Sequence, residues 1–129
     1  MISALYAGIL ALLIVWLSFN VIKLRRANKV ILGDGGVAQL QNAIRAQGNT
    51  TEYIPITLIL LILLELSGAN VWFMHVGGIA IIIGRVIHAK GLLSENLGYR
   101  VLGMQVTFFT IIGLASANIF YTLYKMFSA

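Results

Sequence analysis

Residues 2–22 read ISALYAGILALLIVWLSFNVI, a stretch of 21 residues in which no side chain is charged. About 20 apolar residues are enough for an α-helix to cross the hydrocarbon core of a bilayer. A basic group, Lys23 with Arg25 and Arg26, follows the stretch as a stop, and no basic segment precedes it as in a signal peptide. The stretch therefore predicts a transmembrane helix.

The rest of the chain repeats this pattern. Residues 101–124 form a second uncharged apolar run, and the two apolar stretches in between are separated by the turn sequence SGAN at residues 67–70. We predict an all-α membrane protein, a four-transmembrane-helix bundle in one domain over residues 1–129, with helices at about 2–25, 37–65, 71–90 and 100–126.

The composition agrees with a membrane protein and excludes some chemistry. Hydrophobic residues make up 60% of the 129 residues and charged residues only 10%, whereas soluble domains carry about a quarter charged residues. The chain has no cysteine, which excludes disulfides, thiolate metal sites and a cysteine nucleophile. Any thiol chemistry must therefore use a thiol that the substrate brings.

The net charge of +5 comes from basic residues that lie between the apolar runs or at their ends. This distribution indicates membrane topology, and no nucleic-acid partner is expected. Lys23, Arg25, Arg26 and Lys29 follow the first helix, the third loop has Lys90 and Arg100, and the second loop has no basic residue. The positive-inside rule then predicts cytoplasmic first and third loops, with both termini outside.

Polar residues embedded in the second apolar helix are the first functional signal. Arg45, Asn49 and Glu52 are spaced i, i+4, i+7, which puts them on one helix face. Tyr53 lies beside this face, and Pro55 can bend the helix nearby. Because ionisable groups at membrane depth are costly unless they pair or meet water, this face predicts a polar cavity.

The other helices contribute further cations. Arg85 and His88 are spaced i, i+3 in the third helix, Arg100 opens the fourth, and Arg26 closes the first. A guanidinium stays charged at any physiological pH and binds a carboxylate through two parallel hydrogen bonds. Several arginines around a glutamate and an asparagine suit a ligand with both carboxylates and an ammonium. That is the profile of a small zwitterionic peptide.

Structural interpretations of the same residues remain open. Glu52 can pair with Arg45 or Arg85 as a buried bridge that fixes helix register, and His88 can be an interfacial histidine without a ligand. Glu65, at the outer end of the second helix, is expected to be solvated. Interhelical hydrogen bonds are the expected role of the polar residues in the fourth helix: Thr107, Thr110, Ser116 and Asn118.

Three motifs together resemble a known family. The segment RAQGNTTEYIP at residues 45–55 resembles the signature of the membrane-associated proteins in eicosanoid and glutathione metabolism, the MAPEG family. RRA at residues 25–27 is similar to the paired arginines of the leukotriene-forming member. GRVIH at residues 84–88 resembles the third-helix motif of the microsomal prostaglandin E synthase. The resemblance covers essentially the whole chain and is strongest to short bacterial members.

The resemblance implies a homotrimer in the bacterial inner membrane, with glutathione as cosubstrate in clefts between protomers that open to the cytoplasm. It implies a glutathione transferase or peroxidase that acts on hydrophobic electrophiles arriving from the lipid, without a metal. The free thiol pKa of about 8.5 is lowered by a nearby guanidinium, and Arg100 is the candidate for stabilising the thiolate, with Arg26 also near the sulfur. The implied glutathione contacts are Arg45, Asn49, Glu52, Tyr53, Arg85 and His88.

Departures from the family pattern keep other functions open. Gly48 replaces an arginine of the prostaglandin enzyme, Leu92 stands where both eukaryotic enzymes have tyrosine, and Val101 replaces a serine. Prostaglandin synthesis is therefore not expected. The alternative is a non-catalytic lipid or fatty-acid binding membrane protein on the same scaffold. A small transporter that uses Glu52 as a proton site, and a purely structural membrane protein, are the remaining alternatives.

Overall fold

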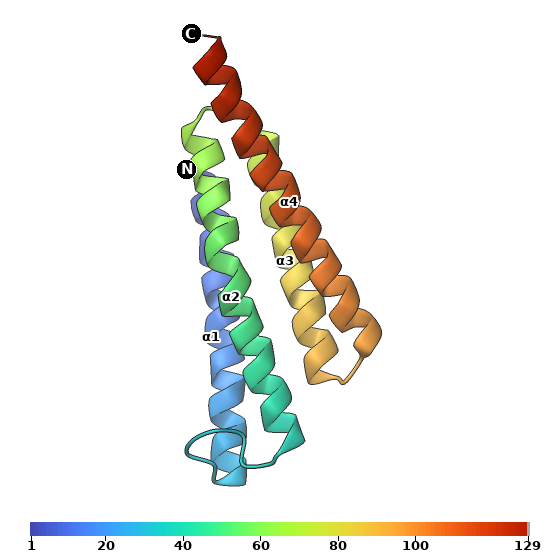
Figure 1. Cartoon of the computed structure of the whole chain (residues 1–129). Helices are drawn as coiled ribbons and strands as arrows, with labels where there is room; N and C mark the ends of the chain where they lie inside the picture. Colours follow the sequence, from blue (N-terminus) through green and yellow to red (C-terminus); the bar gives the residue numbers. More distant parts are fainter. Residues whose placement is uncertain (129) are drawn as a thin grey trace.

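The computed structural model describes residues 1–128, and these form four long helices without a strand. Each helix is long and apolar enough to cross a membrane, which confirms the predicted fold class. The helices run alternately up and down, so both termini lie at one end of the bundle (Figure 1). They are α1 (Ser3–Asn28), α2 (Ala38–Leu66), α3 (Val71–Leu93) and α4 (Leu97–Phe127).

The turn between α3 and α4 is shorter than predicted. α3 continues to Leu93 instead of ending near residue 90, and α4 begins at Leu97 instead of near residue 100. The side chain of Asn96 caps α4 by accepting a hydrogen bond from the backbone N–H of Tyr99. Such a cap satisfies one of the amides that a helix N-terminus leaves free. Arg100 therefore lies within the first turns of α4 and not at its first residue.

Glycines allow α3 and α4 to pack closely. A Cβ added to Gly91 would lie 2.3 Å from the backbone nitrogen of Arg100, and one added to Gly103 would lie 2.4 Å from that of His88. Small residues of this kind let membrane helices approach backbone to backbone. The contact brings the start of α4 against the polar residues of α3.

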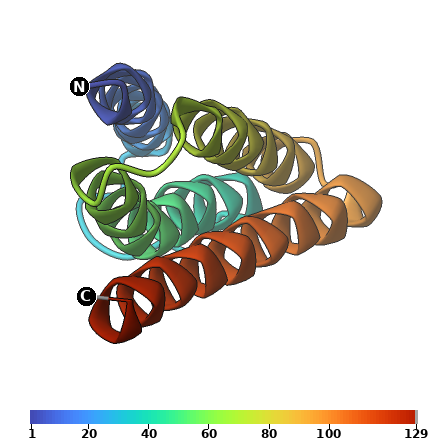
Figure 2. The same ribbon diagram turned by 90° about the horizontal axis from the view of Figure 1, so that it is seen from above.

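Seen along the bundle, α2 and α3 separate α1 from α4 (Figure 2). The backbones of α1 and α4 do not approach each other among the described residues. One apolar core cluster near the basic end of the bundle contains Leu17, Ala46, Ala89 and Leu92. A second cluster, near the termini, is centred on Tyr6, Leu61, Leu64, Met74 and Leu114.

We call the end with the α1–α2 and α3–α4 loops the basic end, because six of the nine basic residues of the chain lie there or just inside it. The opposite end, with both termini and the α2–α3 turn, is the terminal end. The six residues are Lys23, Arg25, Arg26, Lys29, Lys90 and Arg100.

Candidate functional site

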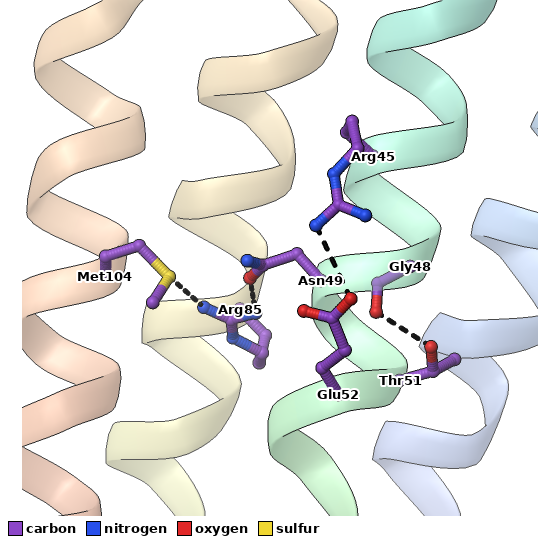
Figure 3. A network of polar contacts seen from close by, with 7 residues as sticks. All are labelled: Arg45, Gly48, Asn49, Thr51, Glu52, Arg85 and Met104. Carbon is purple, nitrogen blue, oxygen red and sulfur yellow. Dashed lines mark hydrogen bonds and ion pairs between the residues drawn. The ribbon is translucent and has the colours of Figure 1, made fainter.

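Arg85 is the centre of the polar interior. The residue is fully buried at 0% exposure. Its Nη1 donates to Asn49 Oδ1 on α2 at 2.5 Å (Figure 3), and its Nε and Nη2 donate to Thr107 Oγ1 on α4 at 3.1 Å and 2.8 Å. Nη2 also reaches the Sδ of Met104 at 3.2 Å, and the guanidinium lies over the Tyr53 ring, 5.5 Å from its centroid. Residues of α2 and α4 therefore surround this one cation of α3.

The groups that hold Arg85 are neutral. Among residues 1–128 the single ion pair within 4.0 Å joins Arg45 Nη2 to Glu52 Oε1 at 3.5 Å, so Glu52 does not pair with Arg85. A buried charge without an opposite charge is costly, and hydrogen bonds to neutral acceptors offset only part of that cost. The arrangement leaves a fixed guanidinium that an anionic ligand group would stabilise.

The Arg45–Glu52 pair differs from the buried bridge that the sequence left open. The two side chains are 50% and 54% exposed in the single chain, so the pair lies on the surface of α2. Figure 3 shows both residues on the same stretch of α2 as Asn49, which reaches toward Arg85. The expected i, i+4, i+7 face is thus one surface, with Asn49 at its inner edge and the ion pair outside.

His88 is buried inside the bundle. It is 2% exposed, one helical turn from Arg85, and its backbone packs against Gly103 of α4. Its Nδ1 has no hydrogen-bond partner among the described residues. Buried polar atoms in proteins are nearly always hydrogen-bonded, so this nitrogen is available to a hydrogen-bonding group of a ligand. The same holds for Thr50 Oγ1 on α2.

The two arginines assigned to the sulfur are not brought together within one chain. Arg100 is exposed on the first turns of α4, and Arg26 is exposed near the end of α1. Arg26 is on α1 and Arg100 is on α4, two helices whose backbones do not approach each other.

Sequence reasoning missed Met104 and understated Thr107. Thr107 was expected to form an interhelical hydrogen bond, and it does so with the most buried charge of the molecule, while also donating to Gly103 O at 2.8 Å. A signal was present: Arg100, Met104 and Thr107 have the same i, i+4, i+7 spacing as the polar face of α2. Met104 gave no separate signal because an apolar residue is ordinary in such a helix.

Glu65, at the terminal end, also has hydrogen-bond partners within the chain. Its Oε1 accepts hydrogen bonds from the backbone nitrogen of Ser3 at 3.0 Å and from Ser3 Oγ at 2.5 Å, and its Oε2 accepts from Ile2 N at 2.5 Å. The carboxylate thus holds the free amides at the start of α1, where a negative charge is favourable. These hydrogen bonds connect α1 to α2 at the terminal end, away from the polar interior around Arg85.

The fold and the polar interior define a small multi-helix membrane protein that holds an uncompensated cation between three of its helices. The chain belongs to the MAPEG family, whose family model matches residues 3–120 and confirms the resemblance seen in the sequence. It is 40% identical over 126 residues to the inner membrane protein YecN of Escherichia coli strain K12, covering 98% of this chain and 96% of that protein. The YecN protein of Escherichia coli O6:H1, strain CFT073, gives the same values.

Proposed function

We propose that this protein binds glutathione at its polar interior and transfers it to hydrophobic electrophiles, as a transferase or peroxidase. The observation that carries the proposal is the buried Arg85, held by Asn49, Thr107 and the Tyr53 ring without a carboxylate. Family membership adds support, because glutathione chemistry is a property of the family. The proposed binding cluster comprises Arg45, Asn49, Glu52, Tyr53, Arg85 and His88.

The chemistry of the ligand matches this cluster. Glutathione has two carboxylates, one ammonium and one thiol, and a guanidinium forms paired hydrogen bonds with a carboxylate. We assign the carboxylates to Arg85 and Arg45, and the ammonium to Glu52. In this proposal the ligand replaces Glu52 as a partner of Arg45, and the Nδ1 of His88 gains a hydrogen-bond partner.

Arg100 is the proposed catalytic residue. A guanidinium near the sulfur favours the thiolate, which is the nucleophilic form. The thiol proton passes to water, the sulfur attacks the electrophilic carbon, and the electron pair of the broken bond leaves with the displaced group. An apolar electrophile dissolved in the bilayer would reach the sulfur laterally.

A homotrimer is the proposed assembly. Glu52 lies near the middle of α2, yet its side chain is about half exposed in one chain. A charged pair at this depth is costly against lipid, so a second copy or water must cover this surface. A neighbouring copy would also supply the Arg26 that one chain keeps away from its own Arg100. The basic end would face the cytoplasm, as the positive-inside rule predicts.

The first experiment is the thermal unfolding of the detergent-purified protein during titration with glutathione, S-hexylglutathione or oxidised glutathione. A ligand at 100 times its dissociation constant adds about 2.7 kcal/mol to the free energy of unfolding. We expect a saturable shift that Glu52→Gln abolishes. Glu95→Gln is the matched control, because it also removes one carboxylate but lies in the exposed α3–α4 turn. No shift with any of the three compounds would contradict the proposal.

Catalysis is tested separately from binding. We expect Arg100→Ala to keep the glutathione-induced thermal shift but to lower the rate of conjugation to an apolar electrophile, with the pH profile moved to higher pH. If Arg100→Ala conjugates at the wild-type rate, Arg100 does not stabilise the thiolate.

One observation favours the alternative of a non-catalytic lipid or fatty-acid binder. Leu92, at the position of a tyrosine in the eukaryotic enzymes, is only 5% exposed and packs in an apolar core cluster with Leu17, Ala46 and Ala89. No hydroxyl is available there to a bound thiol. This alternative predicts a co-purifying lipid and no thermal shift with any glutathione derivative.

A further inference from the structure

A groove on the outside of the bundle lies between α1 and α3, on the half nearer the basic end. Its volume is about 380 Å³. Apolar side chains line most of it, and two polar residues, Lys90 and Ser94, complete the lining at the end of α3. None of the residues assigned to glutathione contributes to it. The apolar lining consists of Leu13, Trp16, Val86, Ala89 and Leu93.

The groove has the depth of one lipid leaflet. From Val86 to Ser94 the chain rises by eight residues, or about 12 Å at the helical rise of 1.5 Å per residue. Half of a hydrocarbon core of about 30 Å is about 15 Å. With α3 crossing the membrane and its C-terminal end at the surface, the apolar part of the groove would lie at acyl-chain depth, and Lys90 and Ser94 near the headgroups.

Lys90 has no acidic partner. It forms no ion pair in the described part of the chain, and the aromatic ring of Tyr99 lies 5.2 Å from its ammonium nitrogen. The nearest carboxylate along the sequence, Glu95, instead accepts a hydrogen bond from Asn42 at 3.5 Å. An unpaired ammonium at the mouth of an apolar groove complements a negatively charged headgroup.

Lys90 and Ser94, the polar mouth of the groove, give it a means of selecting one lipid headgroup over another. Lipid tails are as apolar as the side chains of a membrane helix, so tail packing alone gives little preference for one lipid over another. A larger groove between α3 and α4 has no charged residue in its lining, and nothing in it selects an occupant. Basic pockets between transmembrane helices are known to bind anionic headgroups.

We propose that the α1–α3 groove binds one acyl chain of an anionic phospholipid, whose phosphate contacts the ammonium of Lys90. This site is independent of glutathione and persists whether or not the protein is an enzyme.

The test is native mass spectrometry of the full-length protein after incubation with equal amounts of phosphatidylglycerol and phosphatidylethanolamine that have the same acyl chains. We expect wild-type protein to retain phosphatidylglycerol preferentially. Lys90→Gln should reduce this preference about fivefold, which corresponds to about 1 kcal/mol for one lysine. Lys90→Arg should restore it, because the charge is kept.

Two further variants make the result specific. Lys29→Gln is the matched control, because it removes one exposed lysine from the same end but does not line the groove, and it should retain lipid like the wild type. Val86→Trp should fill the groove and lower retention of both lipids, with thermal unfolding confirming that the variant is folded. Three results would overturn the proposal. They are equal retention of the two lipids by the wild type, an equal loss of lipid preference in Lys29→Gln and Lys90→Gln, or a Val86→Trp variant in which only the mass of the oligomer changes while lipid retention does not.

Discussion

At the scale of the residue, the unusual feature is a buried arginine whose charge is met by neutral groups. Arg85 uses hydrogen bonds to Asn49 and Thr107 and the face of Tyr53, while Glu52 pairs elsewhere. Hydrogen bonds to charged groups contribute more than neutral ones, and an unsatisfied buried donor is expensive. The hydroxyl of Thr107, which accepts from two guanidinium nitrogens, is therefore a main stabiliser of the polar interior.

Thr107→Val tests this role because valine keeps the shape of threonine and removes only the hydroxyl. It leaves Arg85 Nε without an acceptor, so we expect the free energy of unfolding to fall by about 1–3 kcal/mol. Thr107→Ser keeps the hydroxyl and should lose less. Thermal unfolding in detergent measures both variants, and equal stability of the valine and serine variants would contradict this account.

At the scale of the element, backbone contact between α3 and α4 positions the site. Gly91 and Gly103 allow the two helices to approach, which sets the start of α4 beside the polar residues of α3. The contact also explains why α3 and α4 are joined by a turn of only three residues, 94–96, capped by Asn96. Any added volume on this contact must separate the helices that hold Arg85.

Gly103→Ala makes such an addition, since the new Cβ would meet His88 N at 2.4 Å. Overpacking against backbone costs about 1–3 kcal/mol, and we expect a loss at the upper end of that range. Gly113→Ala is the control on the same helix, because nothing lies within 4 Å of its added Cβ. It should be neutral or stabilising, since alanine is the better helix former. The account fails if the two variants unfold at the same temperature.

At the scale of the whole molecule, two features of the single chain support the proposed assembly. A charged pair at mid-membrane is exposed on α2, and Arg26 and Arg100 are on α1 and α4, two helices whose backbones do not approach each other. In the proposed homotrimer, a neighbouring copy would cover the α2 surface and bring its Arg26 toward Arg100. The assembly proposed above would thus complete the site as well as cover it.

Cross-linking tests this assembly directly, because the chain has no native cysteine to interfere. A double variant with Arg26→Cys and Arg100→Cys, treated with a short bis-maleimide in membranes, should give dimers and trimers on a denaturing gel. The control combines Arg26→Cys with Lys125→Cys, which lie at opposite ends of the bundle, and should stay monomeric. A monomeric product from the first pair would exclude the proposed contact between protomers.

The sequence by itself determined the four helices, their approximate limits and the shared face of Arg45, Asn49 and Glu52. These follow from hydropathy and helical spacing, which are local properties of the chain. The tertiary structure alone decided that Arg85 binds Thr107 and not Glu52, and that Glu65 holds the start of α1. These partners lie 22 and 63 residues apart in the chain, so helix packing selects them and no local pattern can.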